Sequence, residues 1–418
     1  TGDAESVLIR NNELRGLHLY GLVLGNSNSD YPGSAINVSV IDNSISRALF
    51  GIFILDPSSG LIQGNRVSVS GTGSTGLFLS SEFDGWIQRN RFADGVTGVR
   101  YDAPTRLSDN EIANNELGLS STVNSAIHGV GYQLGVLPNS IHGNQTGVAL
   151  TVGTLQNQHI HHNTRGVSGS GQLVSSDLAH GNLIEENMIG VDVAGRVEFQ
   201  RISHNAIGIR AANNQLIAHN VIYRNDQGIE VNGKSNVRVV GNTLYTPIGD
   251  LVRVTGGSQQ VELLNNILWS EDGYDIYVAH DSTQGFHSDY NVLHSSGNGK
   301  IGYWTKDFND ILDWQEDIYQ FDLHSIGRTA VNPDWSRPRF VNLALDDYRI
   351  EDQFARQRRS SPSVDAGSPL TDLALPASYV NLLSNPGFES GLTGWLATPS
   401  GSTASTVPPA FEGINYFG

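Results

Sequence analysis

Short segments in which apolar and polar residues alternate recur along the chain and predict β-strands. Segments 9–14, 40–45, 62–67 and 87–92 each place an aliphatic residue three positions before an asparagine and an apolar residue two positions after it. Alternation with a period of two residues, rich in β-branched side chains, is typical of strands with one buried face. We therefore expect a short strand on each side of every such asparagine.

The same pattern can be followed through most of the chain. Aligning on the asparagine gives thirteen positions, and the residue three places earlier is aliphatic in twelve of them. Neighbouring members are mostly 15 to 25 residues apart, with wider steps of 31 and 34 where we expect inserted loops. The thirteen positions are Asn12, Asn43, Asn65, Asn90, Asn110, Asn144, Asn163, Asn187, Asn205, Asn220, Asn242, Asn266 and Asn291.

A second repeating element follows many of these asparagines: a glycine that leads an alternating strand, as in segments 51–54, 76–79, 98–101, 190–193 and 228–231. A period near twenty residues with two or three strand-like pieces per period is the signature of a solenoid. Asparagine suits the corners because its amide can bond turn backbone, and identical amides can stack from one turn to the next. We expect the asparagines to form one such ladder.

These repeats resemble those of the right-handed, single-stranded parallel β-helix proteins, the pectate-lyase-like superfamily of polysaccharide-acting enzymes and surface proteins. The resemblance covers about residues 5–295 and implies an all-β solenoid of about thirteen rungs by the ladder count. It implies a polysaccharide as the partner. The Asp-Pro-His-Asp signature of the alginate epimerases does not occur in the sequence.

The repeat fades after Asn291, and the remaining chain predicts three further parts. Residues 296–370 are rich in aromatic and acidic residues and are expected to cover the open end of the coil, with a short helix at Ile311–Ile318. Residues 371–380 read as a linker. Residues 381–418, which contain Asn-Pro-Gly-Phe-Glu at 385–389, resemble the start of a carbohydrate-binding β-sandwich, so we expect a piece of a longer, multidomain protein.

The amino-acid composition restricts the classes of partner that the protein is expected to bind. The formal net charge is −17 and the only lysines are Lys234, Lys300 and Lys306, so a nucleic acid or an anionic membrane surface is disfavoured. The chain has no cysteine, which removes disulfides and thiolate chemistry. No apolar run reaches the length of a transmembrane helix. We expect an extracellular or cell-surface location.

Residues at the same number of positions before each ladder asparagine should lie above one another in successive turns. The polar residues one and two positions before the asparagines therefore form a predicted candidate site. Imidazoles and carboxylates along one edge are the usual groups for proton transfer or for binding a divalent metal. The alternative is an ordinary hydrated turn edge. The candidate residues are His142, His161, His162, Glu185, Glu186, His204 and His219, with Arg201 close by.

The sequence offers residues for two kinds of enzyme chemistry. A lyase would need a basic residue, for which Arg201, Arg210, Arg224 or Arg238 are available, and Ca²⁺ as the candidate cofactor to bridge an acidic glycan. A glycoside hydrolase needs two carboxylates that face one sugar. Asp192 and Glu230 share the third place of the glycine-led strands and should point outward, so with Arg210 they are candidate substrate-binding residues.

The sequence therefore supports two hypotheses of different classes. In the first, a secreted or cell-surface protein binds, and in an enzymatic version cleaves, polysaccharide along a face of the solenoid. In the second, a non-catalytic adhesive protein uses the coil as a rigid spacer. The loops between Asn12 and Asn43 and between Asn110 and Asn144 are candidate walls of a groove.

Overall fold

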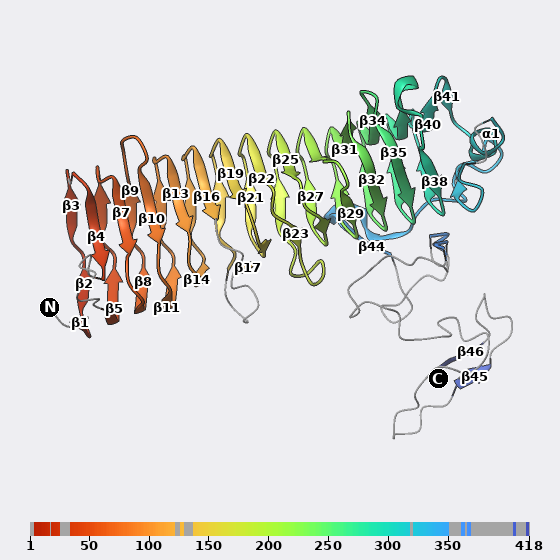
Figure 1. Ribbon diagram of the computed structural model, residues 1–418. Coiled ribbons are helices and arrows are strands. Elements are labelled where there is room, and N and C mark those ends of the chain that lie inside the picture. Colours follow the sequence, from red (N-terminus) through yellow and green to blue (C-terminus); the bar gives the residue numbers. More distant parts are fainter. Residues whose placement is uncertain are drawn as a thin grey trace. The chain divides into compact units, whose positions relative to one another are not determined.

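The computed structural model describes residues 4–16, 18–25, 34–121, 126–128, 137–317, 321–350, 361–363, 366–368, 404–406 and 415–417. The chain divides into two compact units, Thr1–Gly367 and Ser368–Gly418. The first is an all-β parallel solenoid, as the repeat predicts (Figure 1). In the second, β45 (Ala404–Thr406) and β46 (Asn415–Phe417) form an antiparallel pair.

Each turn of the coil contributes one strand to each of several sheets. Sheet I is formed by β1 (Ala4–Glu5), β2 (Leu8–Arg10), β5 (Ala35–Ile41), β8 (Ser58–Gln63), β11 (Phe83–Gln88) and β14 (Thr105–Ser108). Sheet IV takes the same place in later turns and is formed by β23 (Leu173–Val174), β26 (Val197–Glu198), β29 (Leu216–Ala218), β32 (Ser235–Val240), β35 (Gln259–Leu264) and β38 (His287–Asp289).

Sheet II follows next along the chain in each turn and has 14 strands. They are β3 (Glu13–Arg15), β6 (Ser44–Ser46), β9 (Arg66–Ser68), β12 (Arg91–Ala93), β15 (Glu111–Ala113), β18 (Ser140–His142), β21 (His159–His161), β24 (Leu183–Glu185), β27 (Arg201–Ser203), β30 (Val221–Tyr223), β33 (Thr243–Thr246), β36 (Ile267–Ser270), β39 (Val292–Ser295) and β42 (Ile326–Gly327).

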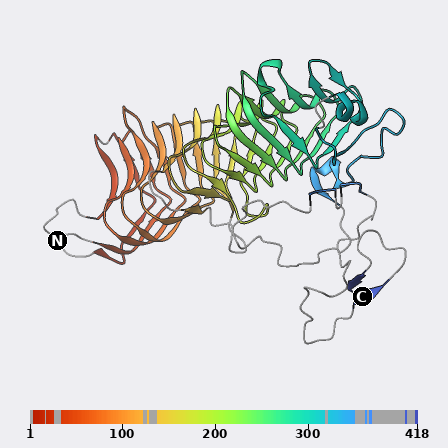
Figure 2. The same ribbon diagram turned by 45° about the vertical axis from the view of Figure 1, so that its right-hand side comes forward.

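Sheet III completes the turn and also has 14 strands, which stack along the coil in Figure 2. They are β4 (Tyr20–Leu24), β7 (Phe50–Ile54), β10 (Thr75–Leu79), β13 (Thr97–Tyr101), β16 (Leu117–Ser121), β19 (Thr146–Leu150), β22 (Arg165–Gly169), β25 (Ile189–Val193), β28 (Ile207–Arg210), β31 (Gln227–Asn232), β34 (Asp250–Thr255), β37 (Tyr274–Val278), β40 (Lys300–Trp304) and β41 (Asp307–Phe308). The short β17 (Ala126–His128) and β20 (Thr154–Gln156) pair separately.

The core is the inside of the coil, and the aliphatic residues that recur before the asparagines fill it. Val40, Ile87, Ile160 and Ile217 are all fully buried. In sheet II the central residue of each strand points inward, so Ile141, Ile160 and Ile184 pair directly in register. The residues on either side of each central residue face outward, since side chains alternate along a strand.

The stacked amides form two ladders, not one, and this corrects the single column expected from the sequence. The first ladder lies where sheets I and IV turn into sheet II. It continues from Asn110 through residues that the alignment left out, and its members are Asn12, Asn43, Asn65, Asn90, Asn110, Asn139, Gln158, Asn182, Gln200, Asn220, Asn242, Asn266 and Asn291.

The second ladder lies where sheet II turns into sheet III. Its members are Asn115, Asn144, Asn163, Asn187, Asn205 and Asn225. We call the two corners that carry the ladders the first corner and the second corner. The turns between Asn110 and Asn225 each contribute one member to both ladders, so the two ladders run side by side over that part of the solenoid.

The coil continues beyond the boundary expected at residue 295. Strands β40 and β42 extend sheets III and II, and β41 then reverses to pair antiparallel with β40. The helix α1 (Ile311–Asp317) forms where a short helix was expected and buries Trp314 completely. The short helices η1 (His280–Ser282) and η2 (Leu343–Leu345) are of the 3₁₀ type.

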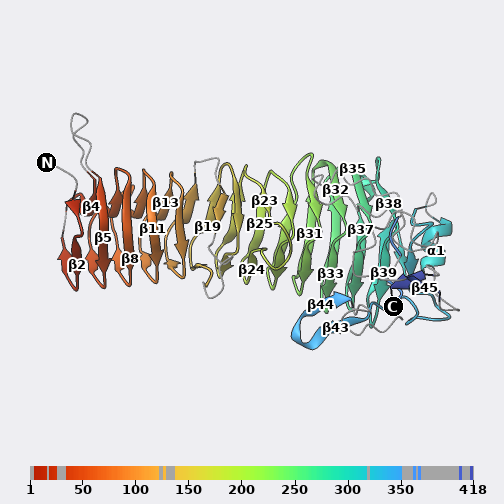
Figure 3. The same cartoon turned by 90° about the horizontal axis from the view of Figure 1, so that it is seen from below.

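A hairpin of β43 (Phe340–Asn342) and β44 (Asp347–Ile350) covers part of the outer face of sheet II (Figure 3). Tyr348 packs there against Tyr245 and Trp269, and Asp346 pairs with Arg224 at 2.8 Å. The face of sheet II on the N-terminal side of this hairpin carries the candidate site.

Several expected features lie outside the described residues. They are the linker at 371–380, most of the predicted β-sandwich start at 381–418, and parts of the two predicted loops, at 26–33, 122–125 and 129–136.

Candidate functional site

The second corner holds one residue of each turn in the left-handed backbone conformation, and this sets the direction of its side chain. Asn114, Gly143, His162, Glu186 and His204 occupy this position in successive turns, with φ between +54° and +66°. Each directly precedes a ladder asparagine, whose amide bonds hold the corner backbone in place. The side chains therefore project outward from the same place on the coil, one turn apart.

The outer face of sheet II supplies a second set of polar side chains beside this corner. His142, His161 and Glu185 end strands β18, β21 and β24 and are direct partners in the parallel register. Ser140 and His159 begin the first two of these strands and point to the same face. Since Ile160 between the two histidines is buried, the alternation along β21 requires both histidines to face outward.

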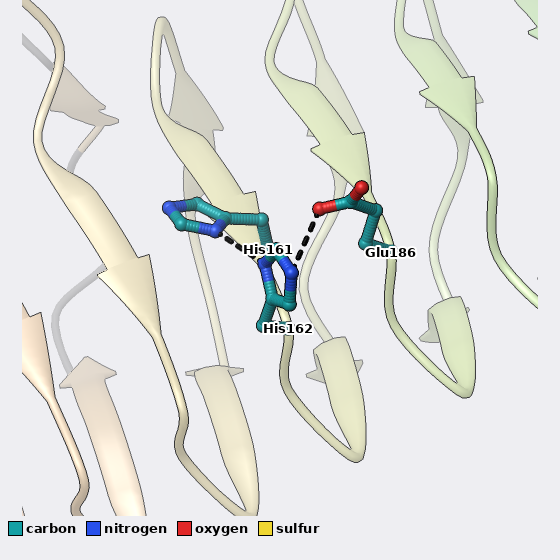
Figure 4. Close-up of side chains that lie close together, drawn as sticks. All are labelled: His161, His162 and Glu186. Carbon is teal, nitrogen blue, oxygen red and sulfur yellow. Dashed lines mark hydrogen bonds and ion pairs between the residues drawn. The ribbon is translucent and has the colours of Figure 1, made fainter.

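Three ligand-type side chains meet where the strand set and the corner set adjoin. Nδ1 of His161 lies 2.8 Å from Nδ1 of His162, and Nε2 of His162 lies 2.9 Å from Oε2 of Glu186. Figure 4 shows the two histidines on one turn and Glu186 on the next, with His162 between the other two. One potential ligand atom of each residue lies within 4.8 Å of the others.

Hydrogen bonds and ring contacts hold His161 in place. Its Nε2 lies 2.9 Å from Oγ of Ser140, and its ring stacks on those of His159 and His142 with centroids 4.2 Å and 4.9 Å away. His159 in turn lies 2.8 Å from Oε1 of Glu185. The His161 ring is thus fixed from several sides before any ligand binds.

The same surroundings keep His161 neutral. Burial, together with the positive charge that His159, His142 and His162 would carry when protonated, lowers the pKa of His161 to about 4. The hydrogen bond from His159 lowers the pKa of Glu185 and keeps it ionised. A neutral imidazole has a free lone pair, which is the form that binds a metal ion.

An open depression of about 830 Å³ adjoins His162 and Glu186. It lies where Gly143 takes the corner position between Asn114 and His162, and the Asn114 side-chain oxygen lies against this glycine. His162, Glu186 and Met188 line it, and Met188 is the only methionine of the chain. Its side chain is 63% exposed.

The structure brings together only some of the residues predicted for this site. His204 follows Glu186 in the corner column but lies against Tyr223 and outside the group of three. Arg201 is exposed on β27, and no ion pair connects its side chain to any described residue. His219 belongs to the first corner, where it is stacked on Phe199, so its prediction as part of this edge was wrong.

The predicted substrate-binding residues lie on a different face. Asp192, Arg210 and Glu230 are outward on adjacent strands of sheet III, as the alternation predicted. Arg210 bridges the two acids, at 3.9 Å from Asp192 and 2.9 Å from Glu230. Both carboxylates are therefore engaged by one guanidinium, which differs from two carboxylates free to act on a sugar.

Two further arginines considered as a lyase base, Arg224 and Arg238, are also paired, whereas Arg201 is not paired with any described residue. Arg224 binds Asp346 at 2.8 Å and Arg238 binds Glu262 at 2.5 Å. The hydrogen bond with Asp346 raises the pKa of Arg224, which opposes its use as a base.

Three residues near the site were missed in the sequence. His159 could have been found, because the sequence His-Ile-His at 159–161 places two imidazoles on one face of a strand. Glu111 pairs with His142 at 3.2 Å across sheet II, and no local pattern marks it. Met188 directly follows the ladder asparagine Asn187, whereas the site was predicted only from the residues one and two positions before each ladder asparagine.

Comparison with known proteins identifies one family. Residues 2–131 match the family described as periplasmic copper-binding protein (NosD). The match covers 130 of 418 residues, which is less than a third of the chain, and ends before His161. No curated protein and no solved structure matches the chain. The expected likeness to the pectate-lyase-like superfamily and to a carbohydrate-binding module has no support from these comparisons.

Proposed function

We propose that this solenoid binds a transition-metal ion, copper foremost, through His161, His162 and Glu186, and that it works in the cell envelope. The observation that carries the proposal is the convergence of two imidazoles and a carboxylate within 4.8 Å. Copper and zinc are commonly bound by imidazole nitrogens together with a carboxylate oxygen.

The donor set also distinguishes between ions. Ca²⁺ takes six to eight oxygen ligands, whereas two of the three groups here are nitrogens, so the Ca²⁺ expected from the sequence does not fit this cluster. Among divalent ions, nitrogen and oxygen sites bind Cu²⁺ most tightly. The exposed thioether of Met188 on the same depression adds a soft donor, which suits copper in its reduced state.

The chain's own residues prepare the site for a cation. His161 keeps its lone pair available because its pKa is about 4. The contact between the Nδ1 atoms of His161 and His162 needs a proton on one of them, and a bound ion would displace that proton. The net charge of −17 attracts cations to the surface.

The family likeness supports the class of function and the location. The matched family is described as periplasmic and copper-binding. In the described part of the chain no helix is long and apolar enough to span a membrane. From the family likeness we propose a location in the periplasm or outside the cell, in line with the extracellular or surface location expected from the sequence.

The polysaccharide-binding function stays a second prediction, with the non-catalytic spacer as its rival. A screen of neutral and acidic glycans for reducing ends and for the absorbance of unsaturated uronates tests cleavage. Since Arg210 engages Asp192 and Glu230, we expect no hydrolysis by that pair.

Isothermal titration of the metal-free protein with Cu²⁺, Zn²⁺ and Ca²⁺ tests the proposed function. We expect one tight Cu²⁺ site, weaker Zn²⁺ binding and no Ca²⁺ binding at this cluster. His162→Ala and Glu186→Gln should each weaken Cu²⁺ binding at least ~10-fold, since losing a metal ligand costs no less than losing an outer-shell partner.

His204→Ala is the matched control, because it removes an imidazole from the same corner column one turn beyond Glu186. It should leave Cu²⁺ affinity unchanged. Equal losses in His204→Ala and His162→Ala, or unchanged binding in His162→Ala, would overturn the proposal.

A further inference from the structure

A second depression, of about 580 Å³, lies at the first corner beside β9 and β12. It forms where Gly64 takes the left-handed corner position, with φ +69°, between Asp42 in the turn before and Arg89 in the turn after. Glycine has no side chain, so this turn leaves a gap in the corner column, and a carboxylate oxygen of Asp42 from the turn before reaches into it. Three arginines surround this gap: Arg66, Arg89 and Arg91.

The positive charge in this depression is not balanced. Arg89 pairs with Asp109 at 3.1 Å, and Arg91 pairs with Glu111. Arg66 is exposed, and its guanidinium has no hydrogen-bond or ion-pair partner among the residues that the structure describes. The lining therefore has three guanidiniums against two carboxylates, and the Asp42 carboxylate that lies against Gly64 is itself paired with Arg10 at 3.6 Å, on a chain whose net charge is −17.

The strand register makes this imbalance unfavourable without a ligand. Arg66 and Arg91 are direct partners in the parallel pairing of β9 with β12. Like charges directly opposite each other on neighbouring strands repel. The partner of Arg66 on the other side is Ser44, which carries no charge to offset it. An anion held between Arg66 and Arg91 would remove the repulsion.

The rest of the lining restricts the kind of anion. The depression has no apolar side chain in its lining, which consists of glycine, asparagine, arginine, aspartate and glutamate residues. Asp109 and Glu111 accept hydrogen bonds but repel a second negative charge. A ligand with one carboxylate and several hydroxyl groups satisfies both conditions, because the carboxylate faces the arginines and hydroxyls donate to the acids.

We propose that this depression binds a hydroxylated carboxylate, the chemistry of a sugar acid. Arg66 is the main contact, since its guanidinium fork is free to bind a carboxylate through two parallel hydrogen bonds. Arg91 and Arg89 add charge from either side, and the volume is in the range of small-ligand sites. The site lies at the other corner and shares none of the three proposed metal ligands, although Glu111 in its lining also pairs with His142 at 3.2 Å.

Titration of the full chain with glucuronate, monitored by calorimetry in the presence of a metal chelator, tests this proposal. Glucose is the neutral control with the same ring, and sulfate is the control for a divalent anion without carbon hydroxyls. We expect glucuronate to bind, glucose not to bind and sulfate to bind more weakly than glucuronate. An acidic disaccharide that binds more tightly than glucuronate would assign the ligand to a polymer, whereas equal affinity would assign it to the free sugar acid.

Two variants make the test specific. Arg66→Ala should weaken glucuronate binding about tenfold or more, as the loss of a charge-assisted hydrogen bond does. Arg66→Lys keeps the charge but loses the guanidinium fork, so its affinity for glucuronate should lie between that of the unchanged protein and that of Arg66→Ala. Arg201→Ala is the matched control, because Arg201 holds the same outward place on β27 and lies outside the depression.

The Arg66 variants should fold normally, since the exposed Arg66 side chain holds no described residue in place. Melting curves of the variants check this. Equal binding of glucose, tighter binding of sulfate than of glucuronate, or unchanged affinity in Arg66→Ala would each overturn the assignment.

Discussion

Asn205 donates its side-chain Nδ2 to Oδ1 of Asn225, 3.0 Å away and one turn further along the coil. The same amide also donates to the carbonyl oxygens of Ile184 and Ser203, and its Oδ1 accepts from both nitrogens of Asn187. One buried side chain therefore satisfies backbone groups in two successive turns and bonds the side chain of Asn225 in a third. This relationship makes the ladder the main polar support of the second corner.

We expect Asn205→Ala to lower the free energy of unfolding by about 3 kcal/mol or more, because it leaves several buried donors and acceptors without partners. Denaturant melts measured by circular dichroism give the change. Asn213→Ala is the control, since this asparagine is exposed and accepts a single backbone hydrogen bond from Ser235. A loss of equal size in both variants would show that the ladder contributes no more than a surface hydrogen bond.

Asp322 ends the first ladder at the C-terminal side of the coil. It is fully buried, and its carboxylate accepts hydrogen bonds from Asn291 Nδ2 at 3.0 Å, Trp314 Nε1 at 2.9 Å and Ser325 Oγ at 2.5 Å. We expect Asp322→Ala to cost about 3 kcal/mol, because three donors lose their acceptor at once. Asp322→Asn keeps one acceptor oxygen and should cost less. Chemical denaturation of both variants decides this, and equal losses would contradict it.

Acid should destabilise the fold through His161. Its pKa is lowered from 6.5 to about 4, so between these values the unfolded chain binds a proton that the folded chain does not. The free energy of unfolding therefore falls as the pH is lowered through this window. His161→Gln removes this contribution, and the difference in urea midpoint between pH 7 and pH 4.5 should become smaller.

The control for this pH effect is His18→Gln, which removes an exposed imidazole far from the cluster. That variant should keep the pH dependence of the natural chain. A dependence that is equally steep in His161→Gln would show that other groups cause the acid effect.

Local sequence predicted the coil but did not separate its two corners. The segments Ile202-Ser-His-Asn205 and Ile217-Ala-His-Asn220 have the same apolar and polar order. Asn205 nevertheless lies at the second corner of the coil, and Asn220 lies at the first corner. Both corners need an inward aliphatic residue, a left-handed residue and a buried amide, so both select the same pattern. The 15-residue step between these asparagines is shorter than the 18 to 24 residues that separate ladder partners around it, and it was the signal available.

The error had a direct effect on the candidate site. Placing Asn220 in line with Asn205 put His219 above His204, whereas it stacks on Phe199 at the other corner. His161, His162 and Glu186 were grouped correctly because Asn163 and Asn187 are true neighbours in one ladder. The pairing of Arg210 with both Asp192 and Glu230 depends on side-chain reach across strands, which alternation along a single strand does not determine.

Met188 should distinguish the two oxidation states of copper. It is exposed on the same depression as His162 and Glu186, and a thioether is a soft donor that favours Cu⁺ over Cu²⁺. We expect Met188→Leu, which keeps the volume and loses the sulfur, to weaken Cu⁺ binding about tenfold and to leave Cu²⁺ binding within about twofold. Competition against a colorimetric Cu⁺ chelator under reducing conditions measures the first, and calorimetry measures the second. Since Met188 is the only methionine, no other thioether can replace it; equal changes for both ions would mean that it acts on the shape of the depression and not as a ligand.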